Sequence, residues 1–257
     1  MKFLTSSTLS GLGRHIHQTF GGAAWNRQIE DAERKELKRQ GADVIVHCAF
    51  NSSRAVDSNN LHAYVADNVA LTQELVSVPH RKFVYLSSVD VYPKELSNCS
   101  EGDAIDIDAV DSIYGVVKLM SESIVKENCP DYLILRCVTL LGRYSRKNSL
   151  SRIFEDDPHK LSLASNSQFN YVLHSDVSDL IRLAVDRGIG GVFNVASSQN
   201  IDLASVAAML GKQVEYGAYR YDVGRIDNSK IASISPVFNK SSRDSICQYA
   251  EMRAGRE

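Results

Sequence analysis

The chain has 257 residues, of which 44% are hydrophobic and 23% charged, and its formal net charge is −2. These proportions predict a globular protein with a sizeable core, and the balanced charge argues against nucleic-acid and anionic-membrane surfaces, so we expect a small-molecule partner. The five cysteines show no metal-ligand spacing, and no stretch reaches the ~18 apolar residues of a membrane span. We therefore expect a soluble, cytoplasmic protein with reduced thiols, no signal peptide and no metal site.

Short apolar runs alternate with helical patterns along the chain. The predicted strands cover residues 3–4, 43–50, 82–88, 132–137 and 191–196. The predicted helices cover residues 13–20, 32–40, 61–76, 113–127, 175–186 and 203–210. Each strand is apolar on successive residues, which is typical of strands buried on both faces of a parallel sheet. We expect an α/β fold with a doubly wound parallel sheet, whose ligands bind outside the carboxyl ends of the strands.

A loop of small residues follows the first predicted strand and opens a helix. It contains Ser7, Ser10, Gly11 and Gly13. Small residues let the backbone approach a pyrophosphate, and the helix N-terminus offers free N–H groups and a favourable dipole. The loop therefore predicts a phosphate-binding turn, although a tight turn that serves only packing has the same composition.

Three residues further along predict hydride-transfer chemistry. Ser88 ends an apolar run, and Tyr114 and Lys118 lie four residues apart in a helical pattern, so they share one helix face. A phenol is a poor acid or base at neutral pH because its pKa is about 10, but a nearby ammonium favours the phenolate. We expect Tyr114 to exchange the proton and Ser88 to hold the reacting oxygen. Since this spacing also arises by chance, the surrounding motifs decide whether it is a site.

Those motifs resemble, in order, the motifs of the short-chain dehydrogenase/reductase superfamily, and most closely its extended branch of nucleotide-sugar epimerases, dehydratases and ketoreductases. The resemblance covers nearly the whole chain. Residues 6–13, 43–50, 87–93 and 112–122 resemble the family patterns T-G-x-x-x-G-x-G, D-x-V-x-H-x-A-A, S-S-x-x-V-Y-G and S-x-Y-G-x-x-K-x-x-x-E. Residues 135–142, 170–177 and 191–195 are similar to its L-R-P-x-x-x-x-G, D-F-I-H-V-x-D-V and G-x-x-Y-N-V segments.

The resemblance implies a Rossmann-type sheet, NAD or NADP as the cofactor, and roles for particular residues. It gives Ser88, Tyr114 and Lys118 the catalytic positions, with Lys118 also bonding the nicotinamide ribose. The residues expected around the cofactor are Ser7, Ser10, Gly11, Leu12, Gly13, Arg14, Cys48, Ala49, Phe50, Asn68, Tyr114 and Lys118. The expected domains are a dinucleotide-binding domain at 1–138 with 174–196, and a small substrate-binding lobe at 139–173 with 197–257.

The chain also departs from the family pattern. Ser7 replaces the first glycine, and the stretch between Gly13 and Asp43 has room for one strand, near residues 23–29, instead of two. The sheet is therefore expected to be trimmed in its second and third strand region, which carries the adenosine half of the cofactor. No acidic residue can be assigned to the ribose 2′-hydroxyl, so NAD and NADP both stay open, and Arg14 and Arg27 are candidates for contact with a 2′-phosphate.

On the substrate side, Asp90, Tyr92 and Arg143 are the candidate contacts, although Asp90 equally fits a turn, Tyr92 the core and Arg143 an exposed surface. A family dehydratase needs a carboxylate pair directly after the active-site serine, and only Asp90 is acidic there. We favour a 4-ketoreductase of a nucleotide-linked sugar. An NAD-dependent nucleotide-sugar epimerase is one alternative, and a catalytically silent relative with a binding or scaffolding role is another. By analogy with the family, helices 61–76 and 113–127 predict a homodimer.

Overall fold

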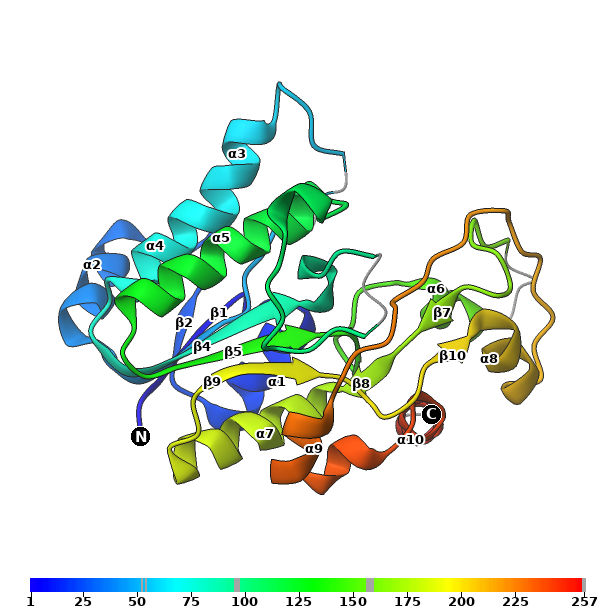
Figure 1. Ribbon diagram of the computed structural model, residues 1–257. Coiled ribbons are helices and arrows are strands. Elements are labelled where there is room, and N and C mark those ends of the chain that lie inside the picture. The colour runs from blue at the N-terminus through cyan, green and yellow to red at the C-terminus, as the bar shows by residue number, and fades with distance from the viewer. Residues whose placement is uncertain (52, 54, 95–97, 156–159, 256–257) are drawn as a thin grey trace.

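The computed structural model describes residues 1–51, 53, 55–94, 98–155 and 160–255. Its centre is a six-stranded parallel sheet with strand order β2-β1-β3-β4-β5-β9 (Figure 1). The strands are β1 (Phe3–Ser6), β2 (Ala23–Trp25), β3 (Ala42–His47), β4 (His80–Ser88), β5 (Tyr132–Cys137) and β9 (Gly191–Val195). This sheet confirms the predicted Rossmann-type fold. The strand order changes direction between β1 and β3, because β2 is added on one side of β1 and the later strands on the other.

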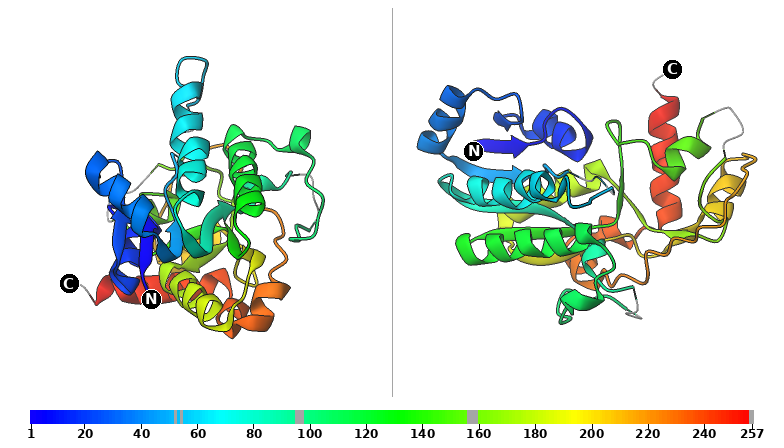
Figure 2. Two further views of the ribbon diagram at one scale, coloured as in Figure 1. Left: turned by 90° about the vertical axis from the view of Figure 1, so that its left-hand side faces the viewer. Right: turned by 90° about the horizontal axis from the view of Figure 1, so that it is seen from above.

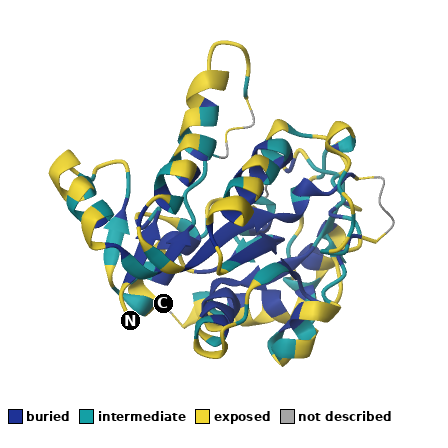
Figure 3. Ribbon diagram, turned by 60° about the vertical axis from the view of Figure 1, so that its left-hand side comes forward, coloured by how far each residue is buried: buried dark blue, intermediate teal, exposed yellow. Residues whose placement is uncertain are grey.

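The strands are apolar on consecutive residues because helices cover both faces of the sheet. On β5, Leu133, Ile134 and Leu135 are all 0% exposed. Leu133 and Leu135 face one core, and Ile134 faces the other. Figure 3 shows the same division, with a buried sheet between helices whose outer sides are exposed.

The helices form a layer on each face of the sheet (Figures 1 and 2). One layer contains α1 (Gly11–Phe20) and α7 (His174–Arg187). The other contains α2 (Asp31–Gln40), α4 (Leu71–Val76) and α5 (Ile113–Asn128). The helix expected at 61–76 is continuous but changes character, from α3 (Leu61–Val65) through a π-helical turn η1 (Ala66–Ala70) into α4. Short 3-10 turns, η2 (Val89–Val91) and η3 (Ile107–Ala109), precede α5.

The edge of the sheet beside β1 is short, as the sequence predicts. Within the described residues, β2 is the single strand between α1 and α2, and it pairs three residues with β1. β2 ends at Trp25, and Trp25, Asn26 and Arg27 line a cavity at this edge of the sheet.

A smaller lobe lies at the carboxyl end of the sheet (Figure 1, right). It contains two small sheets, β6 (Thr139–Leu141) with β8 (Tyr171–Leu173) and β7 (Gln168–Phe169) with β10 (Ile201–Asp202). Its helices are α6 (Ser149–Ile153), α8 (Leu203–Met209) and α10 (Ser242–Ala254). These elements share a core of their own.

Part of the C-terminal segment expected in this lobe packs against the central sheet instead. α9 (Ser229–Ile234) contacts β9, and the following turn is η4 (Pro236–Asn239). Ile231 and Phe238 lie in the same core as Phe193 of β9. The chain therefore leaves the large domain for the lobe and returns to it more than once. Among the described helices, none combines the length and the apolar composition that a bilayer crossing demands.

Candidate active site

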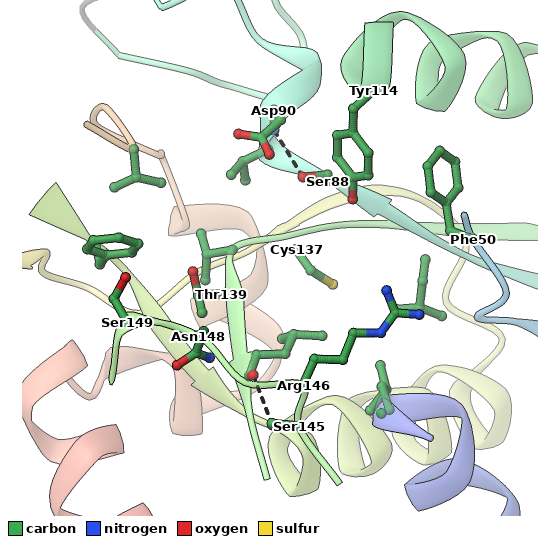
Figure 4. A pocket seen from close by; sticks show the side chains of 18 of the residues that line it. Phe50, Ser88, Asp90, Tyr114, Cys137, Thr139, Ser145, Arg146, Asn148 and Ser149 are labelled. Carbon is green, nitrogen blue, oxygen red and sulfur yellow. Dashed lines mark hydrogen bonds between the residues drawn. The ribbon is translucent and has the colours of Figure 1, made fainter. Parts of the chain in front are cut away.

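Ser88 lies where β4 ends, at the carboxyl edge of the sheet. Its Oγ accepts a hydrogen bond from the N–H of Asp90 at 3.1 Å, in the turn η2. Because this bond uses the oxygen as an acceptor, the hydroxyl proton stays available for a ligand. The Tyr114 side chain lies beside Ser88 in the pocket (Figure 4).

Gly115 brings Tyr114 close to Ser88. Ser112 caps the start of α5, where its Oγ accepts from the Gly115 N–H at 3.1 Å. A Cβ on Gly115 would lie 2.2 Å from the carbonyl oxygen of Asp90, so only glycine lets the helix approach the end of β4 this closely. The first turn of α5 then places the Tyr114 phenol over the end of the strand.

Lys118 lies one turn further along α5 and is 3% exposed. Its Nζ donates to the Leu86 carbonyl at 2.5 Å. The same nitrogen lies 3.9 Å from the ring centroid of Phe50, 4.8 Å from that of Tyr85 and 5.9 Å from that of Tyr114. Aromatic rings therefore surround an ammonium that has one carbonyl partner.

Burial dominates the electrostatics of this pair. It raises the pKa of the Tyr114 phenol, and the nearby Asp90 carboxylate raises it further, while hydrogen bonding with Ser88 opposes both. Burial also lowers the pKa of Lys118 to about 7. Desolvation outweighs the expected effect of the Lys118 ammonium, so the phenolate is not the favoured form of Tyr114 in the ligand-free protein. At neutral pH the phenol keeps its proton and can act as a general acid.

The loop after β1 has the geometry of a phosphate-binding turn. Ser7 adopts φ +61°, the left-handed conformation that glycine takes in the family pattern, and Gly11 adopts φ +59°. A Cβ on Gly13 would lie 2.4 Å from the Ser7 carbonyl oxygen, so glycine is required where α1 packs on the loop. The Gly11 N–H donates to the Tyr144 carbonyl at 2.8 Å, which ties the loop to the segment after β6.

The loop after β3 is fixed to the loop after β1. Ser6 Oγ accepts from the N–H groups of Cys48 and Ala49 at 2.9 Å each, and it also bonds His47 Nδ1 at 2.9 Å. Burial lowers the pKa of His47 to about 3. The ring is thus neutral and packed, and its role is structural.

The first cavity, with a volume of about 690 Å³, lies at the carboxyl ends of β1, β3, β4 and β5. It brings together most of the predicted site residues (Figure 4). The predicted residues that line it are Ser7, Ser10, Gly11, Leu12, Gly13, Cys48, Phe50, Ser88, Asp90, Tyr114 and Lys118.

The second cavity, of about 590 Å³, adjoins the first at the edge of the sheet. Ser7, Ser10, Phe50 and Arg146 line both cavities. The second cavity is further lined by Leu9, Trp25, Asn26, Arg27, Arg34, Ala49, Asn51, Ser53, Asp67 and Leu71. It is an extension of the groove toward the trimmed edge.

Four predicted site residues line neither cavity. The guanidinium of Arg14 stacks over the ring of Tyr144, 4.4 Å from the ring centroid. The guanidinium of Arg143 lies over the same ring, 5.7 Å from the centroid. Asn68 is buried in η1, where its Oδ1 accepts from the Asn51 N–H at 2.7 Å, so it shapes the wall indirectly. Tyr92 is buried beneath the site.

Tyr92 belongs to a buried polar chain that links the two catalytic elements. The Glu122 carboxylate of α5 accepts from Ser87 Oγ at 2.6 Å and from Arg136 Nε at 3.0 Å. Arg136 Nη1 donates to the Tyr92 phenol at 2.9 Å, and the phenol donates to Asn194 Oδ1 at 2.8 Å. Arg136 is therefore a core residue that holds α5, β4, β5 and β9 together.

Several residues that line the first cavity were not predicted from the sequence. They come from the segment after β6 and from two tyrosines near the C-terminal part of the lobe, and they are Arg146, Lys147, Asn148, Ser149, Arg152, Tyr219 and Tyr221. The cationic run at 146–147 directly follows a strand end, which is the one signal that could have found this wall. His174 also lines the cavity, and burial lowers its pKa to about 3, so it is neutral there.

Comparison with known proteins agrees with this geometry. A family model described as the NAD dependent epimerase/dehydratase family matches residues 23–196. No curated protein matches the chain in sequence.

Solved structures resemble the whole fold. A dTDP-4-dehydrorhamnose reductase ortholog from Clostridium acetobutylicum ATCC 824 has a TM-score of 0.82 at 16% identity, covering 99% of this chain and 100% of that chain. The dTDP-4-dehydrorhamnose reductase of Bacillus anthracis str. Ames, in complex with NADP, has a TM-score of 0.81 at 14% identity, with 98% and 100% covered. The UDP-glucuronic acid 4-epimerase of Bacillus cereus, in complex with UDP-glucuronic acid and NAD, has a TM-score of 0.74 at 18% identity, with 96% and 99% covered.

Proposed function

The chain belongs to the NAD dependent epimerase/dehydratase family, and we propose that within it the protein is an NAD(P)-dependent 4-ketoreductase of a nucleotide-linked sugar. The observation that carries the proposal is the meeting of the Tyr114 phenol, the Ser88 hydroxyl and the Lys118 ammonium in one cavity at the carboxyl edge of the sheet. The NAD-dependent nucleotide-sugar epimerase and the silent relative remain the alternatives.

The groove suits a dinucleotide. The positive φ of Ser7 and Gly11 and the absent side chain of Gly13 leave backbone room for a pyrophosphate at the start of α1. When bound, a reduced nicotinamide supplies the hydride that the protein itself lacks. The protein's part is to bind, to orient the sugar ketone and to provide the proton.

The proton comes from Tyr114. Its phenol would give its proton to the keto oxygen, and with a hydride supplied to the carbonyl carbon by a reduced nicotinamide the ketone would become an alcohol. Ser88 donates its free hydroxyl proton as a hydrogen bond to the same oxygen, while the Asp90 N–H fixes Ser88 from behind. The Lys118 charge beside the phenol stabilises the phenolate that remains.

The protonated phenol of the ligand-free protein is the form from which reduction starts. An epimerase begins by removing a hydroxyl proton from its substrate, which needs a phenolate, whereas a reductase begins with a protonated phenol. Burial raises the pKa of Tyr114, so the resting phenol holds the proton that reduction consumes. One carboxylate, Asp90, follows Ser88, which disfavours the dehydratase reaction.

The second cavity supports NADP(H) as the cofactor. The residues directly after β2 are Asn26, Arg27 and Gln28, none of which is acidic, and Arg34 lines the same cavity. Among the described residues that line this cavity, the one carboxylate is Asp67. Arg27 pairs with Asp67 at 2.6 Å, and Arg34 stacks over Trp25 at 5.5 Å. The described part of the chain offers the buried Arg34 Nε no acceptor, so a 2′-phosphate oxygen would satisfy it.

The wall opposite the catalytic residues supports a nucleotide diphosphate as the anchor of the sugar. Figure 4 shows Arg146, Asn148 and Ser149 on this side of the first cavity. Lys147 and Arg152 line the same cavity. Cations at this position attract a diphosphate and leave the sugar between it and Ser88. The division into a dinucleotide-binding domain and a substrate-binding lobe is part of the same proposal.

Two further parts of the proposal concern the protein in the cell. The exposed side chains of Leu61 and Ile113, at 41% and 40%, and of Met120, at 45%, lie on the helices expected to form a homodimer. The five cysteines are all free thiols, which suits a cytoplasmic protein. Sedimentation velocity would contradict the dimer if the protein remained a monomer at micromolar concentration.

The test is a reductase assay. Purified protein is mixed with NADPH or NADH and a nucleotide-linked 4-keto sugar, and nicotinamide oxidation is followed at 340 nm. We expect turnover with NADPH, and a loss of about 10³-fold in kcat for Tyr114→Phe with unchanged folding. Interconversion of two sugar epimers by protein that already carries NAD would favour the epimerase. Failure to bind either dinucleotide at millimolar concentration would favour the silent relative.

A further inference from the structure

Phe50 divides the groove at the point where its two cavities meet. It lies three residues after the end of β3 and occupies the last position of the segment that resembles D-x-V-x-H-x-A-A, where the family pattern has a small residue. It is one of four residues that line both cavities. An aromatic ring thus stands where the pattern leaves open space.

We propose that Phe50 gates the nicotinamide end of the groove: its ring covers the Lys118 ammonium, and it must swing aside before the nicotinamide ribose of a dinucleotide can reach that ammonium. The proposal rests on the proposed reductase function and names a step in how its cofactor binds. The adenosine half enters the second cavity first, and the nicotinamide half follows after Phe50 has moved.

The contacts of Phe50 carry this inference. Lys118 Nζ lies 3.9 Å from the centroid of its ring. The Tyr114 ring meets it edge-on, with centroids 5.0 Å apart and an interplanar angle of 75°. Tyr64 of α3 packs on it in the same way at 6.2 Å. The ring therefore touches both proposed catalytic side chains of α5 and is held by a third aromatic residue.

The donors of Lys118 explain why the ring must move. An ammonium has three N–H groups. One donates to the Leu86 carbonyl, and the rings of Phe50 and Tyr85 cover other sides of the nitrogen. Lys118 lines the first cavity but is 3% exposed, and the Phe50 ring takes up part of the space through which a ribose hydroxyl would approach its Nζ. Tyr85 is 0% exposed in the core of the sheet, whereas Phe50 is half-buried on a loop.

Phe50 can move by a single side-chain rotation. Its χ1 has staggered alternatives, and the two cavities provide space on either side of the ring. Figure 4 shows Phe50 beside Tyr114 and the Arg146 side chain reaching toward this region from the opposite wall. The closed position excludes water from Lys118 when no cofactor is bound.

The first experiment compares a whole dinucleotide with its adenosine half. Calorimetric titration measures NADPH against 2′,5′-ADP, and NADH against ADP, for the native protein, Phe50→Ala, Phe50→Leu and the control Phe20→Ala. Phe20 stacks on Phe3 at 4.6 Å and lines neither cavity. We expect Phe50→Ala to bind the reduced dinucleotide about tenfold more tightly. Its affinity for the half ligand should change by less than this, because Phe50 is one of many residues that line the second cavity. Phe50→Leu should gain less, because it retains bulk, and Phe20→Ala should gain nothing.

The second experiment resolves the two stages in time. Trp25 is the one tryptophan of the chain and lines the second cavity, so its fluorescence reports arrival of the adenosine half. Direct excitation of the reduced nicotinamide reports the other end. In stopped flow, the nicotinamide signal should lag behind the Trp25 signal in the native protein, and the two should coincide in Phe50→Ala.

The outcomes separate the two proposals. Dinucleotide binding that is unchanged or weaker in Phe50→Ala, with normal binding of the half ligand, would overturn the gate and leave the reductase proposal standing. Coincident signals in the native protein would also overturn the gate. If no variant binds either dinucleotide, the reductase proposal fails, and the gate fails with it.

Discussion

Replacement of Lys118 by methionine is expected to make the protein more stable and inactive. The ammonium is 3% exposed, and burial lowers its pKa from 10.5 to about 7. At about 1.36 kcal/mol for each pH unit, folding disfavours the charged form by about 5 kcal/mol. Lys118→Met keeps the stem and removes the charge. The lost contacts with the Leu86 carbonyl and the Phe50 ring offset about 2–3 kcal/mol of this gain, so we expect a net gain of about 2 kcal/mol at pH 6.

The change of this gain with pH identifies its cause. Between pH 7 and 10 the unfolded chain holds a proton on Lys118 that the folded protein has lost, so the unfolding free energy of the native protein rises with pH in this window. Lys118→Met lacks this rise. The difference between the two proteins should therefore shrink by about 2–3 kcal/mol from pH 6 to pH 9.

The assay is urea unfolding at intervals from pH 6 to pH 9, analysed by linear extrapolation. Lys35→Met is the matched control, because Lys35 is exposed on α2, and its difference from the native protein should stay constant. A difference for Lys118→Met that is equally constant across the range would refute the reasoning, since the folded lysine would then keep its ordinary pKa. In the reductase assay, the variant should show no turnover.

Three other substitutions test the local geometry. Ser7→Gly should raise the unfolding free energy by about 1 kcal/mol in urea, because Ser7 holds φ +61°; a loss would mean that the serine hydroxyl stabilises the loop more than its backbone costs. Gly115→Ala should lower the melting temperature and kcat together, because its Cβ would lie 2.2 Å from the Asp90 carbonyl oxygen; a wild-type kcat would contradict the close approach. Glu122→Leu leaves Arg136 buried without its carboxylate and should cost about 3–5 kcal/mol, which a second change, Arg136→Met, should largely restore. Burial opposes the ionisation of Glu122, but the hydrogen bonds and charge of Arg136 lower its pKa overall. The native pair therefore stabilises the fold at neutral pH, and this contribution is lost as the solution is acidified. If the unfolding free energy of Glu122→Leu were as sensitive to acid as that of the native protein, this reasoning would be wrong.

The central sheet was predictable because each of its inner strands is buried on both faces. Such strands are apolar on successive residues, and β4 and β5 lie within one residue or two of their predicted ranges. α10 was not predictable in the same way. Its inward face includes Ser242 and Ser245 beside Ile246 and Tyr249, so half of the buried positions are polar and no apolar period results. A serine in the sequence does not indicate a buried position. Ser242 Oγ nevertheless accepts a hydrogen bond from the Tyr171 N–H at 3.1 Å in the core.

The site was predictable where regular elements position it. Ser88 lies at the end of β4, and Tyr114 and Lys118 share one face of α5. The three side chains come together because α5 is the next α-helix after β4 in the chain and packs against it. The loop residues were not predictable, since no periodicity tells which side chain of a loop turns inward. Arg143 was the predicted substrate contact, but it lies against Tyr144, and Arg146 enters the cavity three residues later.

The Gly11 N–H donates a hydrogen bond to the Tyr144 carbonyl, which connects the segment after β6 to the loop after β1. The Tyr144 phenol, which donates to Gln18 at 2.7 Å, fastens the same segment to α1 a second time. We expect a phosphate oxygen that takes the Gly11 N–H to displace this carbonyl, which leaves the Tyr144 segment held to α1 by the Gln18 bond. If a sugar nucleotide binds only after this release, addition will be ordered, and the oxidised cofactor will inhibit competitively against the reduced cofactor alone in initial-rate kinetics.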